Sequence, residues 1–339
     1  MTPRCNFHCK MCYIHLNPEE MTKQNKKELS VKEWLNIAEA AIENGTLNLL
    51  LTGGEPLLRE DFAEIYNELN QMGFIIGLNT NASLIDEKYY HLFSKYPPTN
   101  VSVTLYGANE DTYRKITGSG ENFKKTIRGL EYLKDIPTNL DIKTTFIKDN
   151  YLELDTIRNI ANRYTQSFAI NYLVFKPVPG VFSEAEHCRL SAKECLEIDI
   201  NNRRYYNELT KKTKKTNKTA TTTPAPDKRD FGLSVYPEVL SCLAAKAAYW
   251  ISWDGRMLPC STFDALYTEP LKEGFAKAWQ RLPTLFTDIH HPTICTECED
   301  FHNCPNCPAY FFAETGHYDK VSPYICDIVK HRHRPDSTT

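Results

Sequence analysis

Long apolar runs are missing from this 339-residue sequence, which nowhere contains the roughly 18 consecutive apolar residues of a membrane-spanning helix. Residues 1–5 also lack the apolar stretch of a signal peptide. There is no excess of basic residues, because 40 Lys and Arg stand against 43 Asp and Glu and the net charge is −3. We therefore expect a cytoplasmic protein that neither enters a membrane nor binds nucleic acid.

Cysteine is absent between Cys12 and Cys188, yet the chain contains 12 cysteines in all. Thiols stay reduced in the cytoplasm, so such a number predicts metal binding or redox chemistry rather than structural disulfides. Hydrophobic residues make up 41% of the chain and charged residues 24%, which excludes a disordered or fibrous protein. The cysteines cluster near both ends, which predicts two metal-binding regions separated by a scaffold.

The scaffold between residues 30 and 180 alternates helix-period and strand-like segments, as βα units around a parallel sheet do. The apolar runs predict five strands, at residues 47–51, 74–79, 101–105, 140–146 and 168–175. A sixth strand would precede Cys5, where only four residues stand, so we expect the start of the first strand to be missing. The fold expected is α/β, a partial (β/α)6 barrel of the TIM type with functional groups on the loops after the strands.

Local capping patterns mark two of the expected helices. Ser30 and Glu33 form a capping box before an apolar stripe, and Gly45 ends that helix. Asn150 and Glu153 have the same spacing and predict a second box.

Composition divides the chain into three parts. Residues 1–180 are the expected barrel, and residues 181–240 are a linker or bridging region. Within the linker, the Lys- and Thr-rich residues 211–223 have no apolar period, which predicts a solvated loop. Residues 241–333 hold seven cysteines with weak periodicity, as in a small domain held together by metal.

The first metal-binding region is the triplet Cys5-x3-Cys9-x2-Cys12. Three thiolates on one short loop hold a 4Fe-4S cubane and leave one iron without a protein ligand. An open coordination position is what a metal needs to bind and act on a substrate. A zinc loop or ordinary reduced cysteines remain as alternatives on these three residues alone.

A second motif, Thr52-Gly53-Gly54-Glu55-Pro56, follows the next expected strand. Paired glycines let a ligand approach the backbone, and a carboxylate can bind an amine. Both motifs then lie at the same face of the expected barrel.

Together the two motifs resemble those of the radical S-adenosylmethionine (SAM) superfamily, although Met11 stands where an aromatic residue often precedes the third cysteine. The resemblance implies that Cys5, Cys9 and Cys12 hold a 4Fe-4S cluster and that an external flavodoxin or ferredoxin supplies electrons. It further implies that a 5′-deoxyadenosyl radical, formed from SAM, abstracts hydrogen from the substrate. The residues implied in SAM binding are Gly53, Gly54, Glu55, Asn81, Thr104 and Arg114. Of these, Arg114 is expected at the carboxylate of SAM, with a surface ion pair as the alternative.

The C-terminal cysteines resemble those of the SPASM domain, which carries auxiliary clusters in radical SAM enzymes that modify peptides and proteins. This resemblance implies two auxiliary iron-sulfur clusters of the 4Fe-4S type. The first cluster would have one open position and be held by Cys242, Cys260 and Cys307. The second would be held by Cys295, Cys298, Cys304 and Cys326. Zinc remains an alternative, because Cys-x2-Cys pairs also suit tetrahedral zinc.

The function expected from these resemblances is the formation of a thioether or carbon-carbon crosslink in a ribosomally made peptide, with a separate leader-peptide recognition protein as a possible partner. Alternatives are maturation of a protein side chain, biosynthesis of a cofactor such as a tetrapyrrole or quinone, and peptide epimerisation. Epimerisation needs a thiol that returns hydrogen, for which Cys188 and Cys195 are candidates. They stand seven residues apart near the start of an expected helix and so on one face of it, and buried structural thiols are the alternative. An iron-sulfur or zinc binding protein with a degenerate barrel is the alternative outside the enzymes.

The acid or base of the reaction has one candidate. Anaerobic sulfatase maturases, which share this architecture, carry an aspartate directly after the second auxiliary cysteine. Ser261 occupies that position here and Asp264 follows it by three residues, so we expect Asp264 to serve as acid or base and sulfatase maturation to be disfavoured.

Overall fold

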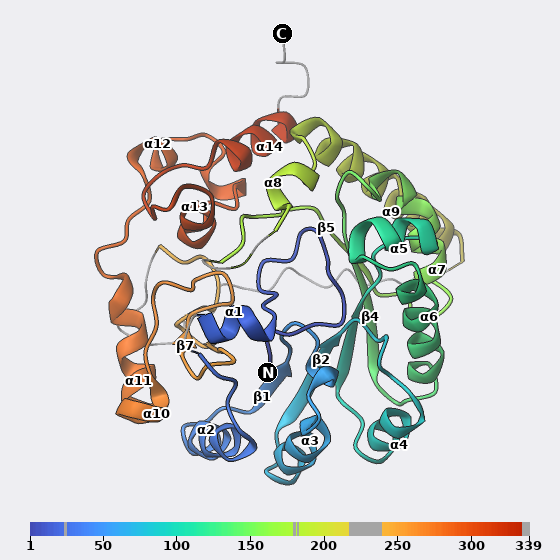
Figure 1. The fold of residues 1–339 in the computed structure, drawn as a ribbon. Coiled ribbons are helices and arrows are strands. Elements are labelled where there is room, and N and C mark those ends of the chain that lie inside the picture. The colour runs from blue at the N-terminus through green and yellow to red at the C-terminus, as the bar shows by residue number, and fades with distance from the viewer. Residues whose placement is uncertain (24–25, 179–180, 182, 217–238, 334–339) are drawn as a thin grey trace.

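The computed structural model describes residues 1–23, 26–178, 181, 183–216 and 239–333 (Figure 1). Among these residues no helix combines the length and the apolar character needed to cross a membrane.

Five parallel strands form the central sheet, in the order β1-β2-β3-β4-β5. The strands are β1 (Asn48–Leu51), β2 (Ile75–Thr80), β3 (Asn100–Thr104), β4 (Asn139–Thr145) and β5 (Phe168–Asn171). This confirms the expected α/β fold and the five strands. The last strand is shorter than expected because the Asn171 side chain accepts a hydrogen bond from the Leu173 amide, which turns the chain out of the sheet.

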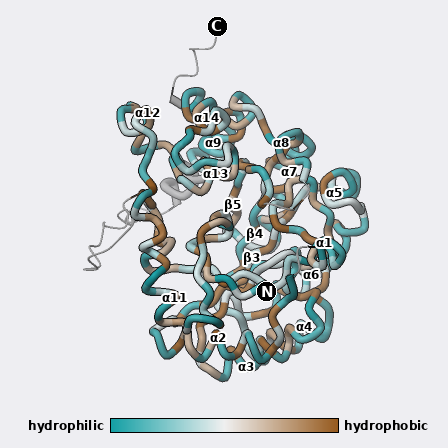
Figure 2. The backbone as a smooth tube through the Cα atoms, turned by 60° about the vertical axis from the view of Figure 1, so that its left-hand side comes forward, coloured by the Kyte–Doolittle hydropathy of each residue, from teal (hydrophilic) through white to brown (hydrophobic). Residues whose placement is uncertain are grey.

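Helices cover the outer face of the curved sheet (Figure 1) and present hydrophilic residues along their outer turns (Figure 2). In the first half of the chain these helices are α2 (Val31–Glu43), α3 (Phe62–Gln71), α4 (Glu87–Lys95), α5 (Glu110–Thr117), α6 (Glu121–Leu133) and α7 (Leu154–Ala161). The short helix α1 (Pro18–Lys23) lies nearer the centre of the view and is not part of this outer layer. The capping box of Ser30 and Glu33 begins α2 as predicted. The apolar stripe of α3 illustrates the packing, since Phe62, Ile65 and Leu69 are all buried.

The second predicted capping box, at Asn150 and Glu153, is wrong. The Asn150 amide donates hydrogen bonds to the carbonyls of Tyr106 and Thr145 instead. The Glu153 carboxylate accepts a hydrogen bond from the Ala108 amide, at 2.8 Å. Both side chains thus tie the loop after β3 to the loop after β4, because partners distant in the sequence replace the local cap.

The N-terminal segment lies against the loop that follows β1. The Met1 ammonium donates to the Thr52 carbonyl at 2.8 Å. The amides of Gly54 and Glu55 donate to the carbonyls of Thr2 and Arg4 at 2.7 and 2.9 Å. The residues before Cys5 are therefore held against the glycine loop after β1 and form no strand of the sheet.

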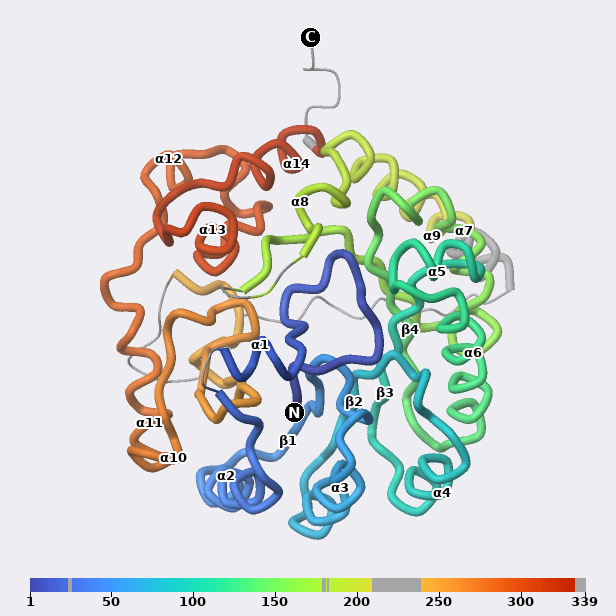
Figure 3. Tube along the Cα trace, in the orientation of Figure 1, coloured from blue at the N-terminus to red at the C-terminus, as the bar shows by residue number. Residues whose placement is uncertain are grey.

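The region from residue 239 to 333 lies between the two edges of the sheet, where a closed barrel would have further strands (Figure 3). On the β1 side, the hydroxyls of Thr46 and Tyr249 are hydrogen-bonded at 2.7 Å. On the β5 side, Arg189 forms an ion pair with Glu314 at 2.9 Å. The remaining elements are α8 (Ala185–Cys188), α9 (Ala192–Thr216), β6 (Trp250–Ile251), β7 (Met257–Leu258), α10 (Pro270–Glu273), α11 (Phe275–Arg281), α12 (Thr293–Thr296), α13 (Pro308–Thr315) and α14 (Pro323–His333). Single 3-10 turns span Pro56–Leu58, Tyr151–Glu153, Leu282–Phe286 and Phe301–Asn303.

Part of the expected solvated loop is helical, since α9 continues through Thr216. Once the first turns of a helix have formed, each added residue costs little, and lysine is a good helix former. Residues 217–223 of that predicted loop lie outside the described residues.

Candidate active site

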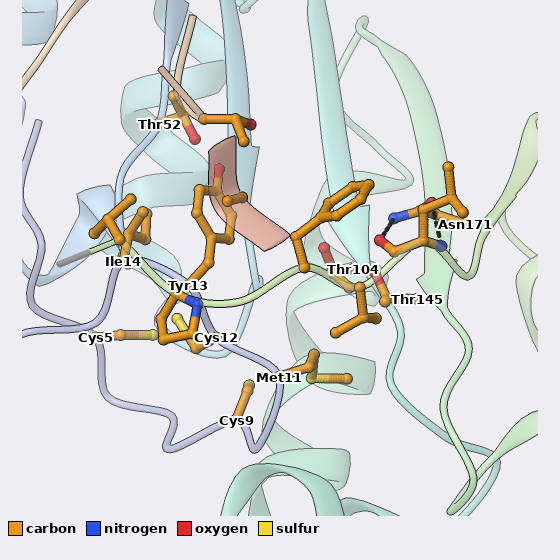
Figure 4. A pocket seen from close by; sticks show the side chains of 18 of the residues that line it. Cys5, Cys9, Met11, Cys12, Tyr13, Ile14, Thr52, Thr104, Thr145 and Asn171 are labelled. Carbon is orange, nitrogen blue, oxygen red and sulfur yellow. Dashed lines mark hydrogen bonds between the residues drawn. The ribbon is translucent and has the colours of Figure 1, made fainter. Parts of the chain in front are cut away.

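A cavity of about 580 Å³ opens at the carboxyl ends of the strands. Its walls come from the cysteine loop, from the glycine loop after β1, from the ends of β2 to β5, from residues 173–178, and from the C-terminal region. In Figure 4 the cysteines approach from a loop on one side, and Thr104, Thr145 and Asn171 lie on the strand ends opposite. This edge of a parallel sheet is where α/β proteins place their reactive groups.

The cysteine loop is anchored to the end of α5. The amides of His8 and Lys10 donate to the carbonyls of Thr117 and Ile116, both at 3.0 Å. The Lys10 ammonium forms an ion pair with Asp149 at 3.1 Å. These contacts hold a loop that has no regular secondary structure of its own, so that its thiols face the cavity.

All three thiols of this loop, of Cys5, Cys9 and Cys12, line the cavity, and none of them forms a disulfide. Burial raises the pKa of each thiol, that of Cys5 to about 12. Cys5 also accepts hydrogen bonds from the Phe7 amide at 3.4 Å and from the Asn81 side chain at 3.8 Å. Thiolates need such donors when they bind a metal cluster. The three thiols therefore fit a cluster with three protein ligands.

Gly53 and Gly54 line the cavity, and the structure shows why neither can carry a side chain. A Cβ on Gly53 would lie 2.4 Å from the Thr2 carbonyl oxygen, and one on Gly54 would lie 2.2 Å from that of Arg4. The sequence attributed these glycines to the approach of a ligand. In the structure they also admit the backbone of the N-terminal segment that carries the first cysteine.

Glu55 is completely buried and does not line the cavity. Its carboxylate accepts hydrogen bonds from the Thr80 hydroxyl, the Leu57 amide and the Asn81 amide, at 2.8, 3.1 and 2.7 Å. Burial raises the pKa of Glu55 to about 7 despite these donors. Its role in the structure is to join the glycine loop to the end of β2.

The other residues expected at SAM divide into two groups. Asn81 and Thr104 line the cavity, and the Asn81 amide donates to the side-chain oxygen of Asn6 at 2.9 Å. Arg114 is not among the residues that line the cavity. Its side chain is 59% exposed on α5 and pairs with Asp111 at 2.5 Å, which is the surface ion pair that the sequence left open. The structure thus brings Asn81 and Thr104 to the glycine loop and the cysteines, but not Arg114.

The C-terminal cysteines form two sets of electrostatic neighbours. Burial raises the pKa of Cys307 to about 11, and the nearby thiols Cys260 and Cys242 add to this rise. Burial likewise raises the pKa of Cys304 to about 12, with contributions from three further thiols, Cys326, Cys295 and Cys298. These are the same two sets that the resemblance implied. Within the described residues, no three His, Cys, Asp or Glu side chains converge as they would around a single metal ion.

A family comparison decides the assignment of the first half of the chain. Residues 1–160 match the family described as "Radical SAM superfamily". Residues 1–160 form a radical SAM domain. The predicted family is therefore confirmed, and its cofactors, SAM and iron-sulfur clusters, agree with the sets of thiols described above.

Similar proteins extend the comparison beyond this domain. The chain is 25% identical to an "AdoMet-dependent heme synthase" of Methanosarcina barkeri, a match that covers 96% of this chain and 94% of the relative. It is 31% identical to a "Probable GTP 3′,8-cyclase" of Saccharolobus solfataricus over 43% of this chain and 46% of the relative.

Two solved structures have the same fold. Streptococcus suis SuiB bound to its precursor peptide SuiA gives a TM-score of 0.70 at 14% identity, covering 96% of this chain and 74% of SuiB. The second, anSMEcpe with bound AdoMet, gives a TM-score of 0.68 at 16% identity, covering 98% of this chain and 95% of that structure. The fold of the radical SAM domain and of the cysteine-rich region thus follows that of these two proteins.

The radical SAM domain and the C-terminal region meet beside the cavity. The Tyr13 hydroxyl, one residue after Cys12, is hydrogen-bonded to the Ser261 hydroxyl, one residue after Cys260, at 3.1 Å. The ring of Tyr310 lines the cavity and stacks on Phe175 with centroids 4.1 Å apart. This side-chain hydrogen bond therefore joins the loop of Cys12 to the loop of Cys260.

Three further predicted residues have defined places. Asp264 lines the cavity, where it pairs with Arg256 at 2.9 Å. Cys188 and Cys195 are buried on α8 and α9, so they do not share the face of one helix as expected, and neither lines the cavity.

Sequence reasoning missed Lys143 and Thr145, which line the cavity from β4. Their signal was the alternation along the strand, in which Asp141, Lys143 and Thr145 share one face. The apolar residues Leu140 and Ile142, by which this strand was predicted, lie on the opposite face.

Proposed function

We propose that this chain is a radical SAM enzyme that modifies an organic substrate in the cavity at the carboxyl ends of the strands. The observation that carries the proposal is the convergence of the Cys5, Cys9 and Cys12 thiols with the glycine loop and Thr104 around this cavity. When bound, the cluster and SAM supply a 5′-deoxyadenosyl radical, which takes a hydrogen atom from the substrate. We also propose that the enzyme works in the cytoplasm with an external flavodoxin or ferredoxin as electron donor.

The chain's own residues bind and orient the reactants. The loop around Cys5, Cys9 and Cys12 presents the three half-buried thiols to the cavity, and the Asn81 side-chain amide donates a hydrogen bond to the Cys5 sulfur. The backbone of Gly53 and Gly54 is proposed to bind the amino acid part of SAM at the β1 end of the cavity. Thr104, at the end of β3, is proposed to bind the ribose.

The substrate class that we propose is a cofactor precursor of the tetrapyrrole type. This is supported by the heme synthases of two further organisms, Oleidesulfovibrio alaskensis and Nitratidesulfovibrio vulgaris, which match 95% and 99% of this chain at 23% and 22% identity. The matches to heme synthases cover nearly the whole chain and so include the C-terminal cysteine region, whereas the GTP cyclases match only about half of the chain.

The peptide crosslink expected from the sequence is the second candidate. It is supported by the residues that follow Cys260 and Cys307 in the sequence, since Thr262, Asp264 and Tyr310 line the cavity. Closing a new bond requires that a substrate radical lose an electron to a nearby acceptor. A cluster held by these cysteines would provide that acceptor. Asp264 is proposed as the acid or base in either reaction, since its carboxylate lies in the cavity wall.

The test is the formation of 5′-deoxyadenosine by reduced, anaerobically reconstituted protein, with mass spectrometry as the readout. Three cubanes predict about 12 irons per chain. Replacing Cys5, Cys9 and Cys12 together with alanine should abolish SAM cleavage and lower the iron content to about 8 per chain.

The control is Cys195→Ala, which removes a buried thiol that belongs to none of the three sets of cluster-binding cysteines. This variant should leave SAM cleavage and iron content unchanged. Stoichiometric zinc, or SAM cleavage by the triple variant, would contradict the proposal. A rise in 5′-deoxyadenosine on adding an iron porphyrin, rather than candidate peptides, would distinguish the two substrate classes.

A further inference from the structure

Strand β4 places a lysine inside the barrel. Successive side chains of a strand point to opposite faces, and along β4 the residues Leu140, Ile142 and Thr144 are buried on one face. Lys143 and Thr145 are on the other face and line the cavity. Lys143 is paired in register with Thr104 of the neighbouring strand.

Lys143 forms no salt bridge with a described residue, although the Asp141 carboxylate on the same face of β4 attracts its charge. Two other charged side chains in the cavity wall are paired, since Asp264 contacts Arg256 at 2.9 Å and Lys176 contacts Glu186 at 3.3 Å. No ion pair or side-chain hydrogen bond joins Lys143 to a described residue. Asp141, on the same face of β4, accepts a hydrogen bond from Asn100 at 2.8 Å.

A partly buried ammonium whose counter-charge forms no hydrogen bond with it is costly, because water that would solvate it has been displaced. Burial accordingly lowers the pKa of Lys143. A ligand that carries a negative charge would remove this cost, and it would form a charge-assisted hydrogen bond with the ammonium. The position of Lys143 in the cavity wall therefore favours an anionic ligand at this point of the cavity.

The amino acid end of SAM is too far away to be that ligand. The glycine loop, which is proposed to bind the amino acid part of SAM, follows β1, and β4 is the third strand beyond β1 in the sheet. Neighbouring strands are about 4.8 Å apart, so the separation along the sheet is about 14 Å. The carboxylate and the amine of SAM share one carbon atom, so both remain near β1.

We propose that Lys143 binds a carboxylate of the substrate and that the substrate is therefore an anionic molecule. This inference rests on the proposed function, because it assumes that SAM and substrate occupy the same cavity. Lys143 is a positioning residue, which holds the substrate beside Thr104 without taking part in hydrogen transfer. Thr145, two residues further along the same face, would add a neutral hydrogen-bond donor.

The probes are haem, which carries two propionate carboxylates, and haem dimethyl ester, in which both are masked. Binding to the anaerobically reconstituted protein is followed by absorbance, and SAM binding by equilibrium dialysis. The variants are Lys143→Met, Lys143→Arg and the control Lys148→Met, whose ammonium contacts the His187 carbonyl at the surface.

We expect the wild type to bind haem about tenfold or more tightly than the ester. Lys143→Met should weaken haem binding by roughly 10- to 100-fold and leave ester binding and SAM binding unchanged. Lys143→Arg should restore part of the loss, because it retains the charge, and the control should match the wild type.

Equal affinity of the wild type for haem and ester would overturn the inference. So would a loss of SAM binding in Lys143→Met, which would assign the lysine to SAM instead. Absence of saturable haem binding, in a wild-type sample that still forms 5′-deoxyadenosine, would overturn this inference and leave the radical reaction intact. Absence of 5′-deoxyadenosine with normal, Lys143-dependent haem binding would contradict the proposed function alone.

Discussion

Replacing Gly54 with alanine tests whether the close approach of the N-terminal segment positions the cysteine loop. The added Cβ would lie 2.2 Å from the Arg4 carbonyl oxygen and 2.6 Å from its carbon. Both are backbone atoms, so the segment must move by about 1 Å to reach ordinary contact. That movement strains the hydrogen bonds from Gly54 to Thr2 and from Glu55 to Arg4.

Overpacking costs about 1–3 kcal/mol, and each weakened hydrogen bond about 0.5–1.5 kcal/mol. Gly54→Ala should therefore lower the free energy of unfolding by about 2–6 kcal/mol, measured by denaturant titration. Because Arg4 precedes Cys5, the first thiol moves with the segment. Iron should fall from about 12 to about 8 per chain, with loss of SAM cleavage.

The matched control is Gly73→Ala. This glycine has a φ of +87°, but its Cβ would meet nothing within 4 Å, and it lies in the turn after α3. The backbone strain alone should cost about 1–2 kcal/mol and leave iron content and SAM cleavage unchanged. Wild-type iron and SAM cleavage in Gly54→Ala would refute the reasoning, because the contact with Arg4 would then place no constraint on the loop.

Three further predictions follow from buried groups. The pKa of Glu55 is raised to about 7 in the folded protein, against 4.5 when unfolded, so the stability of the iron-free protein should fall as pH rises through this window. Glu55→Gln should make the free energy of unfolding less dependent on pH, measured by denaturant titration at pH 5 and 8. An unchanged pH dependence in the variant would contradict this prediction. A double-mutant cycle of Tyr13→Phe and Ser261→Ala should give a coupling of about 1 kcal/mol in unfolding free energy, whereas additivity would mean that their hydrogen bond contributes nothing. Cys188→Ala should keep SAM cleavage and iron content, since this thiol does not line the cavity and packs in the cluster of Met11 and Val174. A loss of substrate turnover alone would instead support its role as a hydrogen donor.

Local patterns in the sequence were sufficient to predict the strands and helices of the scaffold. Alternating apolar periods predicted five parallel strands with helices between them, because burial on one face leaves a period that can be counted. The helix that begins at Ser30 was also predictable, since both partners of its capping box are local. The corresponding prediction at Glu153 failed because a contact with Ala108 in the loop after β3 replaced the local cap.

The spacing of Cys5, Cys9 and Cys12 was enough to predict a set of three ligands on one loop, because these residues lie within a single short segment. Other features depended on which distant segments the fold brings together. Only the tertiary structure placed Arg114 on the surface and buried Glu55 beneath the glycine loop. It also placed Lys143 in the cavity wall without a salt bridge to any described residue, because strand register and the curvature of the sheet, rather than any local pattern, decide which side chains meet there.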